Sequence, residues 1–246
     1  MNKHRPSISL IFPAYNEEDN IEKAVAQARK VLSRIASSWE IIVVNDGSKD
    51  KTGDIINALS GSDNHVRPVH HPTNYGYGAA IKSGITSAKY DYVFFSDSDL
   101  QFDLNELPAF IKLIKDCDIV IGYRSKRQDP FNRKFNAWGW NMLIRIVLGL
   151  KVHDIDCAFK LFRREVFDLI KIDAAGAMVS AELLVQAQRY GFSIKEQPVT
   201  HYPRLMGNPT GANLRVIIKA FRELFRLYAK LKNIKPVNIP ESQKTR

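Results

Sequence analysis

Two aspartates one residue apart carry the clearest chemical signal in this sequence of 246 residues. Asp97 and Asp99 follow the apolar run at 92–95, so they would leave the end of a strand. Side chains at positions i and i+2 of an extended chain point the same way. Carboxylate oxygens suit Mg²⁺ or Mn²⁺, which bridge protein and phosphate groups. The pair therefore predicts a metal site that neutralises a departing diphosphate, with a solvated turn or a helix N-cap as the alternative.

Polar loops also follow the three earlier apolar runs. The first contains Glu17 and the second contains Asp46, while the third holds two glycines, Gly76 and Gly78. Each loop alone has a plainer interpretation, such as a capped turn or an acidic group at a helix N-terminus. Because ligands bind beyond the carboxyl ends of strands in open α/β sheets, the recurrence predicts one site at that edge.

The elements that must position these loops alternate between strand and helix patterns. Apolar runs predict strands at 8–12, 40–44, 65–70, 92–95, 118–121, 157–162 and 194–199. Spacing near 3.6 residues predicts helices at 21–35, 51–59, 78–88, 107–114, 132–149, 182–190 and 214–231. This alternation predicts the α/β class, with a mostly parallel sheet flanked by helices. We expect a catalytic domain at 1–211 and a basic amphipathic helix with its tail at 212–246.

The net charge of +10 is unevenly placed. Residues 122–151 and residues 212–235 each contain seven lysines and arginines against one acid. Such a distribution indicates an anionic partner for the second half of the chain, either lipid headgroups, phosphate ligands or nucleic acid. No nucleic-acid motif is present, and the acids cluster where such a surface would be positive, so we expect no nucleic-acid partner.

Several other functions are disfavoured by missing patterns. The Gly76/Gly78 loop is not G-x-G-x-x-G, because residue 81 is isoleucine, and no Walker motif occurs, which argues against dehydrogenases and P-loop enzymes. Two cysteines, Cys117 and Cys157, give neither a disulfide framework nor metal-ligand spacing. The six histidines also show no metal-ligand spacing and are expected in loops or at the surface. The amino terminus has no signal-peptide pattern, and no apolar run is long enough to span a bilayer.

The order of these motifs resembles the family 2 inverting glycosyltransferases with the GT-A fold. The motifs are Pro-Ala-Tyr-Asn-Glu-Glu from residue 13, Asn-Asp-Gly-Ser from 45, Asn-x-Gly-x-Gly-x-Ala from 74, and Asp-Ser-Asp-Leu-Gln from 97. The segments at 121–124, 154–164, 182–184 and 202–207 narrow the resemblance to the dolichol or polyprenol phosphate mannosyltransferase branch. The resemblance covers roughly residues 7–231.

This resemblance implies roles for individual residues. The expected donor-binding residues are Pro13, Ala14, Tyr15, Glu17, Asp46, Ser98, Gln101, Arg133 and Arg204. The expected ligands of Mg²⁺ or Mn²⁺ are Asp97, Asp99 and Gln101, and the expected catalytic residues are Asp97, Asp99, Asp154 and Arg124. The implied donor is a nucleotide sugar of the GDP-mannose or UDP-glucose type, and the implied acceptor is a polyprenyl phosphate.

Two departures from the branch fall on the sugar or acceptor side. The chain has Asp-Cys-Ala-Phe-Lys at 156–160 where many relatives have Thr/Ser-Gly-Phe-Arg, and Asn-Pro-Thr at 208–210 where relatives often have Ser-Lys. A polyprenyl phosphate would attack the sugar directly, with inversion, because its oxygen is already anionic. The alternative is a sugar hydroxyl in polysaccharide or glycolipid synthesis, which requires a base such as Asp154 or Asp156.

The predicted last helix has an apolar stripe beside its basic residues. The stripe consists of Leu214, Ile217, Ile218, Phe221, Leu224, Phe225, Tyr228 and Leu231. A basic amphipathic helix with aromatic residues can lie in a membrane interface, although it can equally pack on its own domain or on a partner. We therefore expect a peripheral enzyme at the cytoplasmic membrane face, with room for a separate transmembrane partner subunit.

Overall fold

The computed structural model describes residues 5–125, 131–204 and 214–232, with the backbone alone at 131–138, 141 and 214–220. Within this part of the chain, seven strands form one sheet in the order β3-β2-β1-β4-β6-β5-β7. Only β6 among them runs antiparallel, between β4 and β5. The strands are β1 (Ser7–Ala14), β2 (Ser38–Asn45), β3 (Val66–His70), β4 (Tyr92–Phe95), β5 (Ile119–Arg124), β6 (Lys160–Arg163) and β7 (Ile194–Val199).

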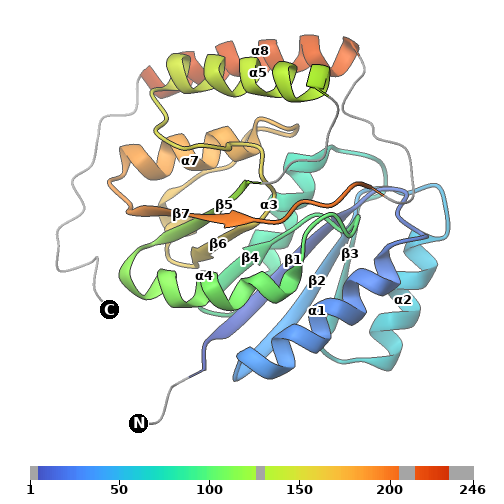
Figure 1. The fold of residues 1–246 in the computed structure, drawn as a ribbon. Helices are drawn as coiled ribbons and strands as arrows, with labels where there is room; N and C mark the ends of the chain where they lie inside the picture. Colours follow the sequence, from blue (N-terminus) through green and yellow to red (C-terminus); the bar gives the residue numbers. More distant parts are fainter. Residues whose placement is uncertain (1–4, 126–130, 205–213, 233–246) are drawn as a thin grey trace.

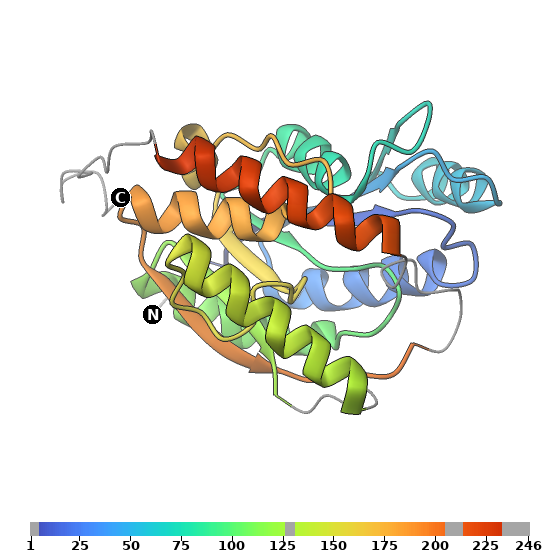
Figure 2. The ribbon, with the colours of Figure 1, turned by 90° about the horizontal axis from the view of Figure 1, so that it is seen from above.

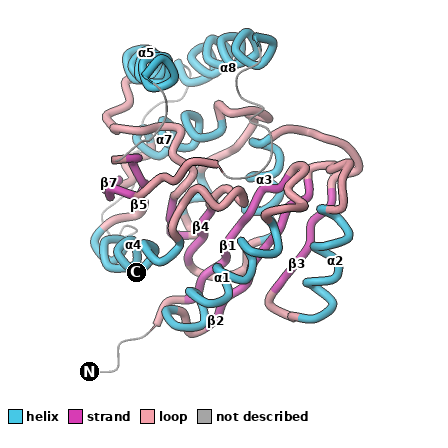
Figure 3. The backbone as a smooth tube through the Cα atoms, turned by 45° about the vertical axis from the view of Figure 1, so that its right-hand side comes forward, coloured by secondary structure: helices cyan, strands magenta, loops and turns pink. Residues whose placement is uncertain are grey.

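Helices cover both faces of this sheet (Figure 1, Figure 3). On one face lie α1 (Ile21–Ile35), α2 (Thr52–Ser62) and α4 (Leu107–Leu113), with the short 3₁₀ turns η1 (Leu104–Glu106) and η2 (Ile114–Asp116). On the other face lie α3 (Tyr77–Ser87), α6 (Val166–Leu169) and α7 (Val179–Arg189). Beyond α7, α5 (Phe131–Leu148) and α8 (Leu214–Lys232) form an outer layer.

The central strands are apolar on both faces because both faces are covered. In β1, Leu10 and Phe12 enter the core on the α1 side, whereas Ile11 between them enters the core on the α3 side. The same alternation places Phe94 and Phe95 of β4 in opposite cores. The sheet is therefore anchored from both sides, and its strand ends supply a rigid edge for the loops that follow.

The antiparallel strand β6 has a direct consequence for that edge. Lys160 at its start pairs with Phe95 at the end of β4 and with Ile121 of β5. Since β6 runs opposite to its neighbours, the segment before it arrives at the edge where the parallel strands end. Residues 154–159 thus lie beside the Asp97–Asp99 segment, although nearly 60 residues separate them along the chain.

The outer layer is a pair of neighbouring helices seen side by side from above (Figure 2). Trp140 of α5 and Phe221 of α8 make an edge-to-face contact with 5.0 Å between ring centroids. Of the predicted stripe, Leu224 and Leu231 are buried in the α7 core, whereas Phe221, Phe225 and Tyr228 are exposed. Leu227, which lies outside the predicted stripe, is buried in the same core.

The helix thus packs on its own domain through part of its stripe and exposes aromatic residues along the rest. The membrane-interface interpretation of these exposed residues stays a prediction. The boundary placed at residue 212 stays a prediction, although the leucines of α8 share one core with α7. In the described part of the chain, no helix combines the length and apolar character that crossing a membrane requires.

Candidate active site

The Asp97–Asp99 segment follows β4 as a turn that is hydrogen-bonded to the end of β1. Ser98 is buried, and its hydroxyl donates to the carbonyl of Pro13 at the end of β1 over 2.9 Å. Leu100 has a φ of +63°, a left-handed conformation that is uncommon for a branched residue and often marks a functional turn. The Asp99 carboxylate accepts the Gln101 amide over 3.2 Å. The turn therefore fixes both carboxylates at the sheet edge.

The two carboxylates lie in an environment that disfavours their charge. Burial raises the pKa of Asp97, while a hydrogen bond from the Tyr77 hydroxyl and the charge of Lys160 partly offset the effect. Burial and the neighbouring charge of Asp97 raise the pKa of Asp99 to about 7. A bound cation would relieve this concentration of negative charge.

These side chains fit a divalent cation that completes its coordination with substrate. Mg²⁺ is commonly held by one or two carboxylates together with substrate phosphates and water, which matches the Asp97 and Asp99 pair. Among the described residues, no cluster of three or more His, Cys, Asp or Glu side chains could hold an ion by itself. The predicted third ligand, Gln101, donates its side-chain amide to the Tyr202 carbonyl over 2.9 Å. Its role at a metal remains a prediction.

The loops after β1 and β2 are joined by reciprocal hydrogen bonds. The Asn16 amide donates to the Ser48 hydroxyl over 3.0 Å, and the Asn16 side chain accepts the Lys49 amide over 2.8 Å. The Glu17 amide donates to the Thr52 hydroxyl over 2.8 Å. Asn16 has a φ of +56°, which turns the chain sharply after Pro13, Ala14 and Tyr15. The predicted donor residues of both loops therefore belong to one framework.

Asp46 organises the next loop through three interactions. Its buried carboxylate accepts the backbone amides of Tyr75 and Gly76 over 2.9 and 2.8 Å. Nδ1 of His71 lies 2.6 Å from the same carboxylate, and Nε2 of His71 lies 2.8 Å from the Ser83 hydroxyl. Asp46 therefore holds the glycine loop, while its predicted contact with donor remains untested. His71 was not among the residues predicted from the sequence, although its position directly after β3 was an available signal.

The glycines of that loop are required by close backbone packing. The Gly78 amide donates to the Ala175 carbonyl over 2.9 Å. A Cβ on Gly78 would lie 2.1 Å from the Ala174 carbonyl oxygen, and Gly76 has a φ of +104°. Between them, Tyr77 places its hydroxyl on Asp97. Tyr77 is a second residue that the sequence analysis overlooked, and its position between two motif glycines was the available signal.

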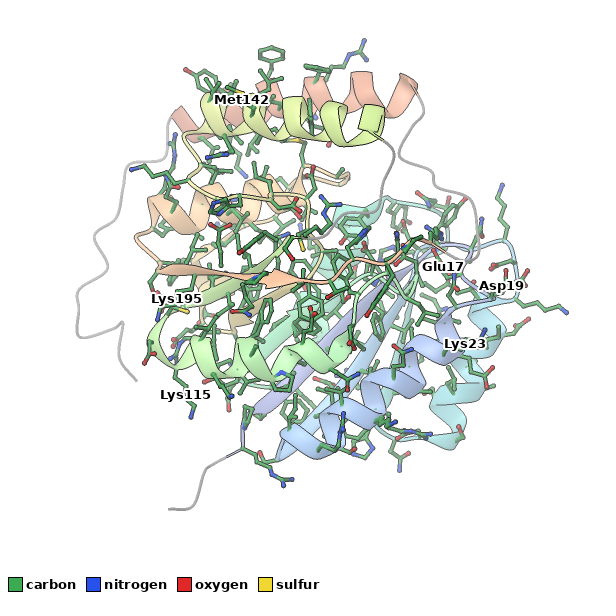
Figure 4. All side chains as sticks on the ribbon, viewed as in Figure 1. Glu17, Asp19, Lys23, Lys115, Met142 and Lys195 are labelled. Atoms are coloured by element: carbon green, nitrogen blue, oxygen red, sulfur yellow. The ribbon has the colours of Figure 1, made fainter. Side chains whose placement is uncertain are left out.

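Arg204 reaches the same region from the end of β7. Its guanidinium lies 2.5 Å from the Glu17 carboxylate and 3.5 Å from the Asp99 carboxylate. The backbone holds this approach, because the Tyr202 amide donates to the Gln101 carbonyl over 2.8 Å. The structure therefore brings Arg204, Glu17 and Asp99 together, as the predicted donor site requires. Figure 4 labels Glu17 near the ends of β1 and β2.

Arg124 and Asp154 form a bidentate ion pair beside these groups. The guanidinium Nε and Nη2 lie 2.6 and 2.7 Å from the two carboxylate oxygens. Burial raises the pKa of Asp154, but hydrogen bonds and charge from Arg124 outweigh it and hold the pKa below its usual value. Asp154 is therefore suited to orienting Arg124 and poorly suited to accepting a proton.

A buried lysine supports the segment that carries Asp154. The Lys160 ammonium is fully buried and donates to the carbonyls of Ile155 and Cys157 and to the Ser180 hydroxyl. Burial lowers its pKa. No role for Lys160 could be predicted from the sequence, because only the antiparallel direction of β6 brings this lysine close to Asp97. The side chain of Arg133, predicted to hold phosphate, lies outside the described residues.

Comparison with known proteins gives one family match and several related chains. The model of the family "Glycosyl transferase family 2" matches residues 9–170. Glycosyltransferase AglD of Haloferax volcanii is 30% identical over 207 residues, covering 80% of this chain and 33% of that protein. Dodecaprenyl-phosphate galacturonate synthase of Rhizobium johnstonii is 30% identical over 211 residues, covering 81% of this chain and 60% of that protein. Undecaprenyl-phosphate 4-deoxy-4-formamido-L-arabinose transferase of Salmonella choleraesuis is 27% identical, covering 85% and 64%.

Solved structures with this arrangement of elements include glucosyl-3-phosphoglycerate synthase of Mycobacterium tuberculosis. Its complex with UDP has a TM-score of 0.68 at 22% identity and covers 91% of this chain and 80% of that chain. Its complex with Mn²⁺, UDP and glucosyl-3-phosphoglycerate has a TM-score of 0.64 at 23% identity, covering 92% and 78%. The chain spans from a third to just under two thirds of the length of the curated relatives described above.

Proposed function

Because the chain belongs to glycosyl transferase family 2, we propose that it transfers a hexose from a nucleotide sugar to a polyprenyl phosphate. Two relatives are named for sugar transfer to dodecaprenyl or undecaprenyl phosphate, which supports this acceptor class. The observation that carries the proposal is the juxtaposition of the half-buried Asp97 and the buried Asp99, with the guanidinium of Arg204 lying 3.5 Å from the Asp99 carboxylate. Such a site can hold a metal ion and a diphosphate together.

In the proposed mechanism, Asp97 and Asp99 would hold Mg²⁺ or Mn²⁺, with Gln101 as a further candidate ligand. When bound, the ion would neutralise the charge of the departing nucleoside diphosphate. The loops of Glu17 and Asp46 hold the nucleoside, because they form the adjoining part of the same edge. Arg204, released from its carboxylates, holds a phosphate group.

Arg124 is the residue we assign to the acceptor phosphate. Asp154 fixes its guanidinium through two hydrogen bonds, which leaves the charge of the arginine oriented before the acceptor arrives. The acceptor phosphate oxygen attacks the anomeric carbon and the bond to the diphosphate breaks, with inversion in a single displacement. No general base is required, because a phosphate oxygen is already anionic near neutral pH. This agrees with the lowered pKa of Asp154.

The outer face of α5 and α8 is the proposed membrane-facing surface. Its exposed apolar side chains are Met142, Ile146, Phe221, Phe225 and Tyr228. Exposed Arg145, Arg222 and Arg226 lie on the same two helices. Aromatic residues with basic neighbours suit the headgroup level of an anionic bilayer, where each basic residue contributes about 1 kcal/mol. Figure 4 labels Met142 on α5 in this layer. We place the enzyme at the cytoplasmic face, where nucleotide sugars are available.

A donor and acceptor assay tests the reaction. A panel of radiolabelled nucleotide sugars, with polyprenyl phosphate and Mn²⁺, should give a labelled lipid with one donor. Asp97→Ala and Asp99→Ala should each remove nearly all of this transfer, while Asp116→Ala, at an exposed carboxylate, should keep it. Full activity in both site variants would refute the metal assignment. Label in an oligosaccharide with none in lipid would indicate the hydroxyl acceptor instead.

A vesicle assay tests the surface separately. Co-sedimentation with anionic vesicles at low salt should fall strongly in Phe225→Ser, because this ring is 65% exposed and contributes nothing to the core. Leu169→Ser removes an exposed apolar side chain from α6 and is the matched control. If the wild type stays in the supernatant with these vesicles, the membrane-facing surface is wrong, whatever the reaction proves to be.

A further inference from the structure

The guanidinium of Arg204 lies between two carboxylates, Glu17 and Asp99, to which we assign different roles. It lies 2.5 Å from Glu17, on the nucleotide side, and 3.5 Å from Asp99, on the metal side. The side chains of Arg204, Glu17 and Asp99 are 23%, 11% and 8% exposed, so water screens these contacts only in part. The guanidinium thus supplies positive charge at the carboxylate that a metal ion would use.

The position of Arg204 is set by the fold. The bridge between Phe102 and His201 and the two hydrogen bonds between Gln101 and Tyr202 tie the end of β7 to the segment after Asp99. Arg204 follows two residues later, which leaves its side chain directed at Asp99. An arginine fixed in this way competes with any other cation for the same oxygens.

We propose that Arg204 competes with the divalent ion for Asp99 and that the diphosphate of the donor ends this competition. A guanidinium and a divalent cation repel each other at short distance, so the binding of one to the Asp99 carboxylate weakens the binding of the other. A diphosphate supplies an anion between them, because its oxygens can accept hydrogen bonds from Arg204 while they coordinate the metal.

The consequence is a coupling between two ligands. The metal binds weakly by itself, since it must displace Arg204, and binds tightly once a nucleoside diphosphate accepts the guanidinium. By linkage, the metal strengthens nucleotide binding by the same factor. Arg204 is thus a positioning residue that makes metal and donor bind together. This inference rests on the proposed function, because it assumes that Asp99 is a metal ligand.

Mn²⁺ binding to the full chain without nucleotide tests the competition directly. The free Mn²⁺ signal in electron paramagnetic resonance gives the dissociation constant for wild type, Arg204→Met and Arg204→Lys. Arg204→Met should bind Mn²⁺ tighter by on the order of fivefold or more. Arg204→Lys keeps the charge and should stay closer to wild type. Arg29→Met removes a distant surface charge, paired only at 3.7 Å with Asp63, and should leave the dissociation constant unchanged.

The same titration with UDP or GDP present completes the test. The nucleotide should tighten Mn²⁺ binding strongly in wild type and much less in Arg204→Met. Equal or weaker Mn²⁺ affinity of Arg204→Met without nucleotide would overturn the competition, while leaving the proposed function intact. If Mn²⁺ binds to none of these proteins even with either nucleotide, the metal assignment fails, and this inference fails with it. A gain of affinity can come only from folded protein, so misfolding cannot mimic the expected result.

Discussion

The edge of the sheet and the outer helical layer are built in opposite ways. At the edge, which comprises the loops after β1 to β4, polar groups are buried and bind one another, as Asp46 does with two backbone amides and His71. In the outer layer of α5 and α8, aromatic and basic side chains are exposed instead, and Phe225 is 65% exposed. The polar groups of the edge are thus satisfied by one another, whereas the aromatic and basic side chains of the outer layer are exposed.

This difference fits the two tasks that we propose for these regions. Groups that handle a nucleotide and a metal must be preorganised, so their positions depend on many mutual contacts. A surface that meets lipid headgroups needs only the right composition. We therefore expect substitutions at the edge to have large, position-specific effects, and substitutions between the outer layer and the core to have small ones.

The largest effect is expected for Gly78→Ala. The new methyl group would overlap the Ala174 carbonyl oxygen, at 2.1 Å, so the glycine loop must move away from its neighbour. We expect a loss of about 4 kcal/mol in the free energy of unfolding, measured by urea denaturation. Gly61→Ala in α2 meets no atom within 4 Å and should be neutral or stabilising by up to about 1 kcal/mol. Similar losses in both variants would contradict a tightly built edge.

Removing one partner of the Arg124–Asp154 pair should have the next largest effect. Asp154→Ala leaves a guanidinium that is only 12% exposed without its carboxylate, which should cost about 3 kcal/mol of stability. Glu196→Ala breaks the pair with His153, whose side chain is 73% exposed, and should cost less than about 1 kcal/mol. Chemical denaturation of both variants measures the difference between their free energies of unfolding. A loss of less than about 1 kcal/mol of stability for Asp154→Ala would contradict this prediction.

The pH dependence of the free energy of unfolding tests the raised pKa of Asp99. Burial and Asp97 raise the pKa of this group from 3.8 to about 7 in the folded protein, so between these values the folded chain keeps a proton that the unfolded chain releases. Stability is therefore lost as pH rises through this window. Without metal, Asp99→Asn should be more stable than wild type by on the order of 2 kcal/mol at about pH 8 and similar to it at about pH 4. Urea denaturation at the two pH values checks this, and a pH-independent difference would count against it.

The smallest effect is expected where α8 meets α7. The Lys230 ammonium lies 3.0 Å from Glu182 and 2.6 Å from Asp173. Its side chain is 34% exposed and that of Asp173 is 65% exposed, so water screens this pair. The buried Glu182 keeps its hydrogen bonds from the Asp173 and Ala174 amides. Lys230→Met should cost about 1 kcal/mol, and Lys195→Met, in a pair exposed on both sides, should cost nothing measurable. A loss of 3 kcal/mol or more for Lys230→Met would show that the outer layer is as tightly built as the edge.

Most of the fold could be predicted from the sequence, because each element carries its own local pattern. The GT-A fold expected from the motifs is confirmed by the family match and the similar structures. Strands predicted at 92–95 and 194–199 have the observed bounds, as does the helix at 21–35. The strand predicted at 157–162 begins later, at Lys160, since the lysine ammonium binds the carbonyls of the preceding turn.

The contacts within the site were less predictable, because they join distant segments. The motifs identified Asp97, Asp99 and Glu17, but no local pattern indicates that Arg204 lies between the last two. That contact depends on the isolated bridge between His201, just after β7, and Phe102. The burial of Lys160 likewise depends on the antiparallel direction of β6, which alternation of strands and helices does not specify. The residue roles themselves stay predictions until substitution tests them.

The ion pair of Arg124 and Asp154 also joins the two ends of a long excursion. The chain leaves the sheet after Arg124 and returns at Asp154, and the two residues bind side chain to side chain and through the Arg124 amide at 3.3 Å. The ion pair therefore holds together the two ends of the segment that connects these residues. The intervening residues are tied to the domain a second time, because Ile144, Leu148 and Leu150 pack in the core on the α3 side of the sheet.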